Sequence, residues 1–455
     1  MQKKLFFSTQ PLKGVYKYII PAAKQHSEQN LKKKLQYTFI KVKKIQPDII
    51  FFVVKCLLCG KFFKKETLMN LKYKSLNLGR YAISEVYRNP KCYFSKIKYY
   101  YELLKAIYLI ASYAKYAINL KNINSVYLDH CMYKNGILIE VFSQKNIPIY
   151  ALGYPRGFFL FKMDKKKQLK KYEEIIQLNK SKKINQLQKK KASKALREAL
   201  LKTEKFPWMQ HIAFKDNIKI NLNEITHVVY IHSFTDAQLV YGYDGFLNVF
   251  EWFKFTLNEL LKNKNNKILV KAHPSFFHEK FPNKMAMHDR MIFFKLIKDY
   301  NSSNVIILKD PIRNKQLLNK ISKQTILISH HGSVVLESLF MGFKCITSAA
   351  TFWNDQFHIT NSWKNVSEYK KLLYKKWNVL KYPNKNDLMN VSYQLFCNPK
   401  GIYGKNYWEH ILIKNLKISK SSLFQNSSKI LQKIKISQNK KNKINKEIIF
   451  SLEKI

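Results

Sequence analysis

The sequence predicts an α/β protein built on parallel sheets, and three observations support this prediction. Short continuous apolar segments alternate with amphipathic segments of helical period through the second half of the chain. A strand–helix–strand spacing also occurs in the first half. The 455 residues are 46% hydrophobic, which is enough apolar material for cores in roughly two to three domains.

The first half is predicted to mix strands and helices. Residues 47–58 (PDIIFFVVKCLL) are rich in β-forming residues and predict a buried strand. Residues 99–120 predict a core helix, because charged residues leave an apolar run of only about nine residues, short of a membrane span. Residues 125–129, 133–145 and 147–152 predict the strand–helix–strand unit.

The second half predicts a parallel sheet covered on both faces, a Rossmann-like lobe of about 170 residues. The expected strands are residues 226–231, 267–271, 305–308, 325–329 and 344–347. The expected helices are residues 246–261, 289–299, 313–321 and 334–341. Gly342 follows the last helix at the position where a glycine commonly ends a helix.

Changes in composition predict where one part of the chain gives way to the next. Residues 163–205 are dominated by Lys, Gln, Asn and Glu, with Leu and Ile at helical spacing, and predict exposed basic helices between two lobes. The tail from about Lys414 is open to two interpretations, a return helix onto the first lobe or a loose basic end. The expected divisions are a first Rossmann-like lobe (1–162), a basic helical connector (163–224), a second Rossmann-like lobe (225–400) and a basic C-terminal tail or return helix (401–455).

The charge is strongly positive, with 82 Lys and Arg against 29 Asp and Glu, or +53. Only six of the basic residues are Arg, the usual residue for bidentate recognition of phosphate and guanine. Lys, Asn, Ile, Tyr and Phe all have A/T-rich codons, so base composition accounts for much of the charge. We therefore expect a surface that attracts nucleotide phosphates or acidic headgroups, and no specific nucleic-acid interface.

The sequence predicts neither a targeting segment nor a metal centre. Residues 1–12 are basic and lack the apolar run of a secretory signal. Cys56 and Cys59 form a CxxC without the second pair that a zinc site needs. No Walker, HExxH or GxSxG pattern occurs. We expect a cytoplasmic protein without cofactor or metal, with basic faces suited to the anionic inner-membrane surface.

The turns after four predicted strands carry the chemistry. In a parallel sheet the carboxyl ends of the strands meet at one edge, where ligands bind. Four histidines follow these strands, together with two aspartates, three serines and a lysine. The turns are His232-Ser233-Phe234-Thr235-Asp236, Ala272-His273-Pro274-Ser275, Lys309-Asp310-Pro311 and His330-His331-Gly332-Ser333.

The segment HHGSVVLE has features of an anion site. Gly332 permits a tight turn with close backbone approach, and Ser333 is placed to cap the following helix. Glu337 lies one turn further on, where a carboxylate would accept hydrogen bonds from sugar hydroxyls. The pattern suits a nucleotide sugar with its phosphates at the helix N-terminus. The alternative is a capped helix with a solvated Glu.

Several segments resemble bacterial capsule or surface polysaccharide biosynthesis glycosyltransferases, which are similar to other two-lobe GT-B transferases. The resemblance covers roughly residues 121–353. It rests on LDHCMYKNGILIEVFSQKNIPIYAL, VVYIHSFTDA with YGYDGFLNVFEW, KILVKAHPS, and LISHHGSVVLESLFMGFKCI. It implies two Rossmann-like lobes with parallel sheets, a cleft between them, and a metal-independent reaction. The first lobe would hold the acceptor and the second the donor.

The resemblance also implies site residues. His273, His331, Ser333 and Glu337 would hold the donor, and Lys271 would balance its phosphates. The neighbouring His232, Ser233 and Gly332 complete the expected donor set. Many retaining GT-B enzymes have two Glu separated by seven residues, but Ser329 stands at that position here, so no retaining mechanism is implied.

A base for the acceptor hydroxyl is harder to name. Asp236 and His130 are the two candidates, neither is favoured over the other, and the alternative that neither of them is the base stays open. Asp129 is not expected to orient His130, because neighbours on a strand point to opposite faces. His330 is expected to be structural if His331 faces the ligand.

The expected function is transfer of a sugar from a nucleotide-sugar donor to a saccharide or lipid-linked saccharide acceptor. A close variant would transfer a polyol phosphate or a CMP-linked acidic sugar. Two other classes stay open: a non-catalytic capsule assembly or export partner with the same fold, and a basic nucleic-acid-binding protein, which charge alone favours.

Overall fold

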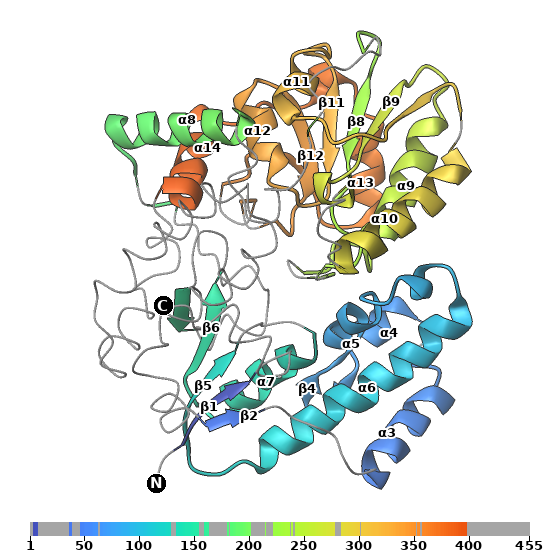
Figure 1. The fold of residues 1–455 in the computed structure, drawn as a ribbon, viewed down its shortest axis with the longest axis vertical. Helices are drawn as coiled ribbons and strands as arrows, with labels where there is room; N and C mark the ends of the chain where they lie inside the picture. The colour runs from blue at the N-terminus through green and yellow to red at the C-terminus, as the bar shows by residue number, and fades with distance from the viewer. Residues whose placement is uncertain are drawn as a thin grey trace, which may run out of the picture. The chain divides into compact units, whose positions relative to one another are not determined.

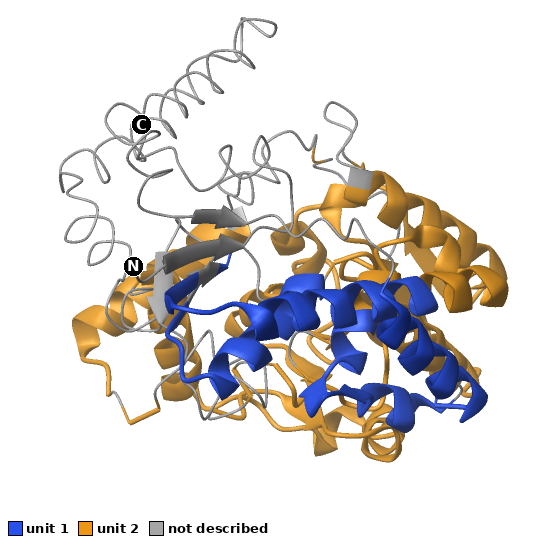
Figure 2. Ribbon diagram, turned by 90° about the horizontal axis from the view of Figure 1, so that it is seen from below, with its two compact units in different colours: residues 1–82, 103–175, 403–455 blue, residues 83–102, 176–402 orange. Residues whose placement is uncertain are grey.

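The computed structural model describes residues 3–7, 36–38, 46–61, 64–128, 133–153, 159–162, 180–181, 183–201, 214, 222–236, 238–239, 242–277, 284–300, 302–351, 353–354 and 357–397. The chain divides into two compact units (Figure 2). Unit 1 comprises residues 1–82, 103–175 and 403–455, and unit 2 comprises residues 83–102 and 176–402. The domain boundaries expected from composition stay a prediction.

Unit 2 is built on a six-stranded sheet in which all neighbouring strands are parallel. Its spatial order is β10–β9–β8–β11–β12–β13; β8, β9, β11 and β12 are labelled in Figure 1. The strands are β8 His227–Tyr230, β9 Ile268–Lys271, β10 Val305–Leu308, β11 Ile326–Ser329, β12 Lys344–Ser348 and β13 Asn361–Trp363. The predicted α/β fold with a parallel sheet is confirmed. The sequence missed β13, because three residues carry too short a pattern to predict a strand.

One face of this sheet packs against three helices. They are α9 Val249–Leu261, α10 Lys284–Ile297 and α13 Val366–Leu373. Trp252, Phe293 and Tyr369, one from each helix, are buried in a single core with Val229 and Val270 of the sheet. Asparagine side chains begin two of these helices by accepting a hydrogen bond from a backbone N–H of the first turn, at Asn248 and Asn365.

Other helices pack together elsewhere in unit 2. They are α8 Gln186–Leu201, α11 Asn314–Leu318, α12 Val334–Phe340 and α14 Lys385–Ser392. α12 contacts α8, α11 and α14, and it leads directly out of the turn after β11. Gly342 follows α12 with φ +83°, the left-handed conformation that the sequence predicted for this position.

Unit 1 contains a second sheet, of order β2–β1–β5–β6–β7. The strands are β1 Lys3–Phe7, β2 Gln36–Thr38, β5 Ile123–Leu128, β6 Ile149–Gly153 and β7 Phe159–Lys162. Only β7 runs antiparallel to its neighbour among these described strands. α7, Tyr133–Gln144, joins β5 to β6 and confirms the predicted strand–helix–strand unit.

Further helices and a hairpin precede the strand–helix–strand unit in the sequence. They are α3 Pro47–Leu58, α4 Lys65–Met69, the hairpin β3 Lys72–Tyr73 with β4 Leu76–Asn77, α5 Gly79–Val86 and α6 Lys96–Asn119. α6 confirms the helix predicted at residues 99–120. The strand predicted at residues 47–58 is wrong, because this segment is the helix α3. Pro47 at its start, Asp48 in its first turn and Lys55 in its last turn are helix signals that the β-branched composition obscured.

Two predicted segments are described only in part or not at all. α8 supplies a basic helix within the expected connector at residues 163–205, of which residues 163–179, 182 and 202–205 lie outside the described residues. The tail from Lys414 also lies outside the described residues. In the part of the chain that is described, no helix combines the length and apolar character needed to cross a bilayer.

Gly136→Ala should test the packing of unit 1. A Cβ atom at Gly136 would lie 2.1 Å from Cε1 of Tyr81, a buried ring. We expect the free energy of unfolding to fall by about 1–3 kcal/mol because the ring must move. Urea unfolding measures the change. Gly342→Ala is the comparison, since a Cβ there meets nothing within 4 Å and only its positive φ opposes the substitution; an equal loss in both variants would contradict the steric argument.

Candidate functional site

Three histidine rings meet at the carboxyl edge of the unit 2 sheet. His232 follows β8, His273 follows β9 and His331 follows β11. The ring centroid of His232 lies 4.3 Å from that of His331 and 5.7 Å from that of His273. The structure therefore brings together three turns that are far apart in the chain, as the strand pattern predicted.

The strand register explains why the rings meet. Each histidine lies two positions beyond the last residue of its strand, and these last residues are Tyr230, Lys271 and Ser329. Tyr230 is paired with Lys271 on one side and with Ser329 on the other. Because side chains alternate along a strand, residues two positions beyond an aligned row continue on the same side of the sheet.

His330 belongs to the opposite side. Its Nε2 lies 3.0 Å from Oδ2 of the buried Asp244. Its ring centroid lies 5.5 Å from that of Trp252 and 5.9 Å from that of Trp363. Its Nδ1 also lies 2.7 Å from Nδ1 of the adjacent His331. His330 therefore links the helix-covered core to the site, the structural position that the sequence analysis considered for it.

The three clustered histidines are held neutral. Burial lowers the pKa of His273 to about 3 and the pKa of His331 well below its ordinary value. The nearby His232 opposes protonation of both rings, and Lys271 also opposes protonation of His273. Burial also lowers the pKa of His232, while the Asp236 carboxylate opposes that shift. The backbone N–H of Ser275 donates to Nδ1 of His273, so the ring proton of His273 is on Nε2. Neutral imidazoles of this kind offer both donors and acceptors to a ligand.

Four buried polar or charged side chains lie beside the histidines. Tyr230 donates its hydroxyl hydrogen bond to Asn314 (2.8 Å), and the Asn314 amide donates to Glu337 (3.1 Å). Burial raises the pKa of Glu337 to about 7 and lowers the pKa of Lys271 to about 8. Each of these two charges partly offsets the effect of burial on the other. Lys271 and Glu337, both expected to bind the donor, thus lie in one electrostatic environment.

Asp289 of α10 anchors the turn after β8. Its carboxylate accepts hydrogen bonds from the Ser233 hydroxyl and from the Thr235 hydroxyl and backbone N–H, the last two at 2.9 Å. It also accepts from the Phe234 N–H at 2.9 Å. Burial raises the pKa of Asp289 to about 6, against the effect of these hydrogen bonds.

Asp289 and Asn314 were missed by the sequence analysis. Both contribute from helices and belong to no local motif, so no spacing in the sequence signals their role. Ser233, expected to bind the donor, instead gives its hydroxyl hydrogen to Asp289 and accepts from the Asp236 N–H at 3.0 Å.

The turn after β11 differs in one detail from its prediction. The Gly332 N–H donates to Oγ of Ser329, and a Cβ at Gly332 would lie 3.0 Å from that same atom, so the backbone passes close by as expected. Ser333 stands at the start of α12, but its backbone is already helical and its side chain makes no capping hydrogen bond. The expected cap is therefore wrong, because the chain turns through Gly332 before Ser333 can adopt the extended capping conformation. Ser333 is exposed.

The two candidate bases are placed unequally. Asp236 lies in the exposed part of the turn after β8, near enough to His232 to act on its pKa. His130 and the adjacent Asp129 lie outside the described residues. Among the described residues, no group of three or more His, Cys, Asp and Glu side chains has a metal-binding arrangement.

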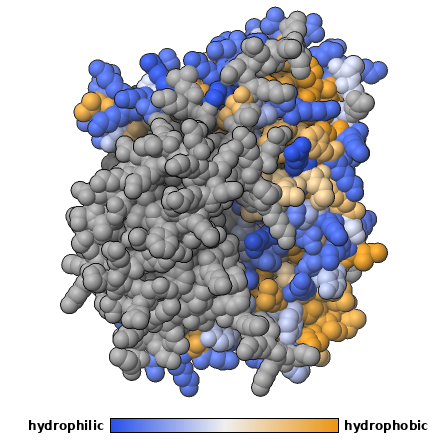
Figure 3. All heavy atoms as spheres, in the orientation of Figure 1, coloured by the Kyte–Doolittle hydropathy of each residue, from blue (hydrophilic) through white to orange (hydrophobic). Residues whose placement is uncertain are grey.

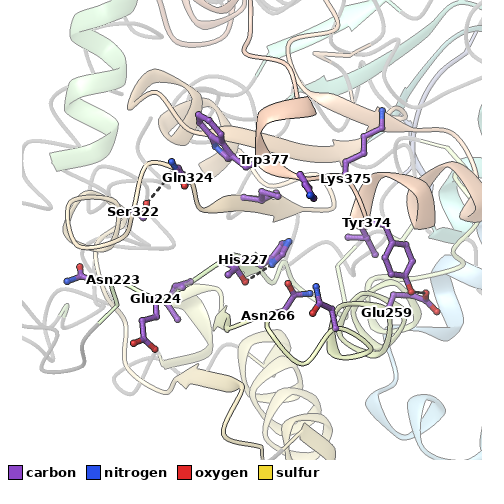
Figure 4. Close-up of a pocket in the computed structure, with 16 residues that line it drawn as sticks. Asn223, Glu224, His227, Glu259, Asn266, Ser322, Gln324, Tyr374, Lys375 and Trp377 are labelled. Carbon is purple, nitrogen blue, oxygen red and sulfur yellow. Dashed lines mark hydrogen bonds between the residues drawn. The ribbon is translucent and has the colours of Figure 1, made fainter.

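A separate pocket of about 380 Å³ lies near the amino ends of β8 and β11, away from the histidine cluster (Figure 4). His227, Gln324, Tyr374 and Trp377 are among its lining residues. Burial lowers the pKa of His227 to about 4. None of the site residues predicted from the sequence lines this pocket.

Comparison with known proteins gives structural similarities only. No family model matches the chain, and no curated protein matches it. A β-Kdo 2,4-transferase, KpsC of Thermosulfurimonas dismutans, is similar over 60% of this chain and 80% of its own, with TM-score 0.37 and 11% identity. A trehalose 6-phosphate synthase of Burkholderia multivorans covers 89% of this chain and 96% of its own, with TM-score 0.31 and 8% identity. The UDP-GlcNAc 2-epimerase of Methanocaldococcus jannaschii is similar over 87% of this chain and 99% of its own, with TM-score 0.27 and 14% identity.

Glycosyltransferases, the class that the sequence motifs resemble, are thus among the similar structures. All three TM-scores are below 0.5.

Asp289→Ala should loosen the turn after β8. The substitution leaves the buried N–H groups of Phe234 and Thr235 without their acceptor. We expect the free energy of unfolding to fall by about 2–4 kcal/mol, the cost of two unsatisfied buried donors. Asp299→Ala is the matched control, since Asp299 is exposed, and it should change stability by less than about 0.5 kcal/mol. Equal losses in the two variants would contradict the anchoring role.

The stability of the site should depend on pH through His273. Its pKa falls from 6.5 to about 3 on folding. Below pH 6.5 the unfolded chain therefore binds a proton that the folded protein does not bind, and the free energy of unfolding falls as the pH drops from 6.5 toward 3. We expect the wild type to lose stability relative to His273→Gln between about pH 7 and about pH 5, by at most about 1.4 kcal/mol per pH unit. Urea unfolding of both proteins at the two pH values measures the difference, and a pH-independent difference would contradict it.

Proposed function

We propose that this chain is a glycosyltransferase that transfers a sugar from a nucleotide-sugar donor to a growing capsule or surface-polysaccharide acceptor, free or lipid-linked. The observation that carries the proposal is the meeting of His232, His273 and His331 at the carboxyl edge of a parallel sheet. Ligands of open parallel sheets bind at this edge. The sequence motifs that resemble capsule glycosyltransferases fall on the same turns.

The donor phosphates and sugar hydroxyls match the chemistry of this edge. The Nε2–H of His273 suits a phosphate or hydroxyl oxygen, and a neutral imidazole binds it without a fixed positive charge. Lys271, with a pKa of about 8, stays mostly protonated at neutral pH and balances phosphate charge. Glu337, with a pKa of about 7, can accept a hydrogen bond from a sugar hydroxyl when ionised or donate one to it when protonated.

The reaction is attack of an acceptor hydroxyl on the anomeric carbon of the donor. The new bond is the glycosidic C–O bond, the bond to the nucleotide phosphate breaks, and the hydroxyl proton passes to a base. Asp236 and His130 remain the candidate bases. Lys271, with the backbone N–H groups of Ser333 and Val334, would stabilise the departing phosphate.

The proposed sugar transfer and its close variants differ in the nucleotide of the donor. A uridine or guanosine diphosphate sugar supports hexose transfer, whereas cytidine nucleotides support transfer of a polyol phosphate or an acidic sugar. A non-catalytic assembly partner would keep the fold without turnover. A nucleic-acid-binding protein would show steep salt dependence that survives substitutions at the histidine cluster.

Donor binding is tested by thermal shift with UDP, GDP, CMP and their common sugar conjugates. A donor at about 100 times its Kd adds about 2.7 kcal/mol to the free energy of unfolding, so the melting temperature should rise for one nucleotide class. His273→Ala should reduce that rise by weakening binding about tenfold or more, the effect of about 1.4 kcal/mol or more of lost interaction.

Gln324→Ala is the matched control in the same unit, because Gln324 lines the pocket near the amino ends of the strands. It should leave the nucleotide-dependent shift unchanged. If no nucleotide raises the melting temperature of the wild type, or if His273→Ala responds as the wild type does, the donor site is elsewhere. Product formation from the nucleotide that binds then separates an enzyme from a non-catalytic partner.

A further inference from the structure

Helix α3 exposes an apolar face to solvent. Five apolar side chains of this twelve-residue helix are exposed: Ile50, Phe51, Val54, Leu57 and Leu58. The largest exposed fractions are 71% for Phe51 and 81% for Leu58. At about 100° per residue these five positions fall within an arc of about 120°, and no charged residue of α3 falls inside it. Hydrophobic surface is visible over this part of the molecule in Figure 3.

The opposite face of α3 is anchored within unit 1. Ile49 and Cys56 are buried. The rings of Phe52 and Tyr73 are in contact, with centroids 5.0 Å apart. The Asp48 carboxylate pairs with Lys115 of α6 at 2.7 Å. These contacts determine which side of the helix packs inward, so the exposed apolar arc is a stable feature of the surface.

Lysines lie beside the exposed arc on α3 and in the residues that follow it. Residues 55–74 contain six lysines and one glutamate, and all six lysines are exposed. Lys55 is on α3 itself, about 40° from Phe51 on the helical wheel. An apolar strip edged by lysines is the pattern of a helix that lies in the interface of an anionic membrane.

We propose that α3 binds this protein to the surface of an anionic lipid bilayer, with its apolar arc inserted among the headgroups and with Lys55 and the lysines that follow it in the chain paired with acidic lipids. The charge around the arc selects this occupant. A second copy of the chain would bring an equally basic surface against the first, which like-charge repulsion opposes. An apolar peptide partner would leave the lysines without counter-charges.

The proposal goes beyond glycosyl transfer and does not depend on it. It assigns the membrane contact to one helix rather than to the overall charge. α8 offers the comparison, because it is a strongly basic helix in which, among the residues whose exposure is described, Leu187 (61%) is the one exposed large apolar side chain. Charge alone predicts that α8, with five basic residues and one Glu, contributes more than α3, with one Lys and one Asp, whereas an inserted apolar face predicts that α3 contributes more.

Sedimentation with lipid vesicles tests the proposal on the full chain. Wild-type protein should sediment with phosphatidylglycerol–phosphatidylcholine vesicles and bind pure phosphatidylcholine vesicles much less. The double variant Phe51→Ser with Leu58→Ser should bind the anionic vesicles about tenfold more weakly, because two large apolar side chains no longer insert. Leu187→Ser should bind as the wild type does. Raised salt should weaken binding without abolishing it.

Three results would overturn the proposal. The first is absence of wild-type binding to anionic vesicles. The second is equal binding by the wild type and the double variant, which would assign binding to charge alone. The third is a wild-type dimer that the double variant converts to a monomer, measured by analytical ultracentrifugation, which would make α3 a subunit interface. Vesicle binding and nucleotide-induced thermal shift are separate readouts, so failure of one leaves the other intact.

Discussion

The register of three neighbouring parallel strands is the constraint on which the candidate site depends. β8, β9 and β11 end at one level, with Tyr230 between Lys271 and Ser329. In each of these three strands, the residue two positions after the last strand residue has its side chain on the same side of the sheet. Three histidines occupy those positions, so backbone hydrogen bonding alone aligns groups that lie up to 99 residues apart in the chain (331 − 232). A shift of one residue in any strand would turn its histidine to the opposite face.

Burial then determines what these aligned groups can do. It holds the histidines neutral, draws the pKa of Lys271 down to about 8 and draws that of Glu337 up to about 7. An edge with neutral donors and acceptors beside one lysine can bind phosphates and hydroxyls together, which suits a sugar nucleotide better than a polyanion. Asp289 supports the arrangement from a helix, because it satisfies backbone groups that the turn after β8 would otherwise leave unpaired.

The comparison of α3 with the sheet strands explains where prediction from sequence failed. Residues 47–58 and the sheet strands are both rich in apolar and β-branched residues. Residues 47–58 differ from a buried strand only in the helix signals at their ends, Pro47, Asp48 and Lys55. The structure makes the segment a helix with one face packed on α6 and β3 and the other exposed. Short apolar runs are ambiguous between helix and strand, and here the tertiary contacts of Asp48 and Phe52 decide between them.

Local patterns along the chain were enough to predict the parallel sheet of unit 2, most of its strands and helices, and the gathering of His232, His273 and His331 at one edge. These follow from local periodicity and from the rule that parallel strands share their carboxyl edge. Three features emerge only in the folded chain: His330 turns toward Asp244, Asp289 and Asn314 support the site, and Ser333 does not cap its helix. These depend on side chains from distant segments meeting in space, and no spacing along the chain encodes such meetings.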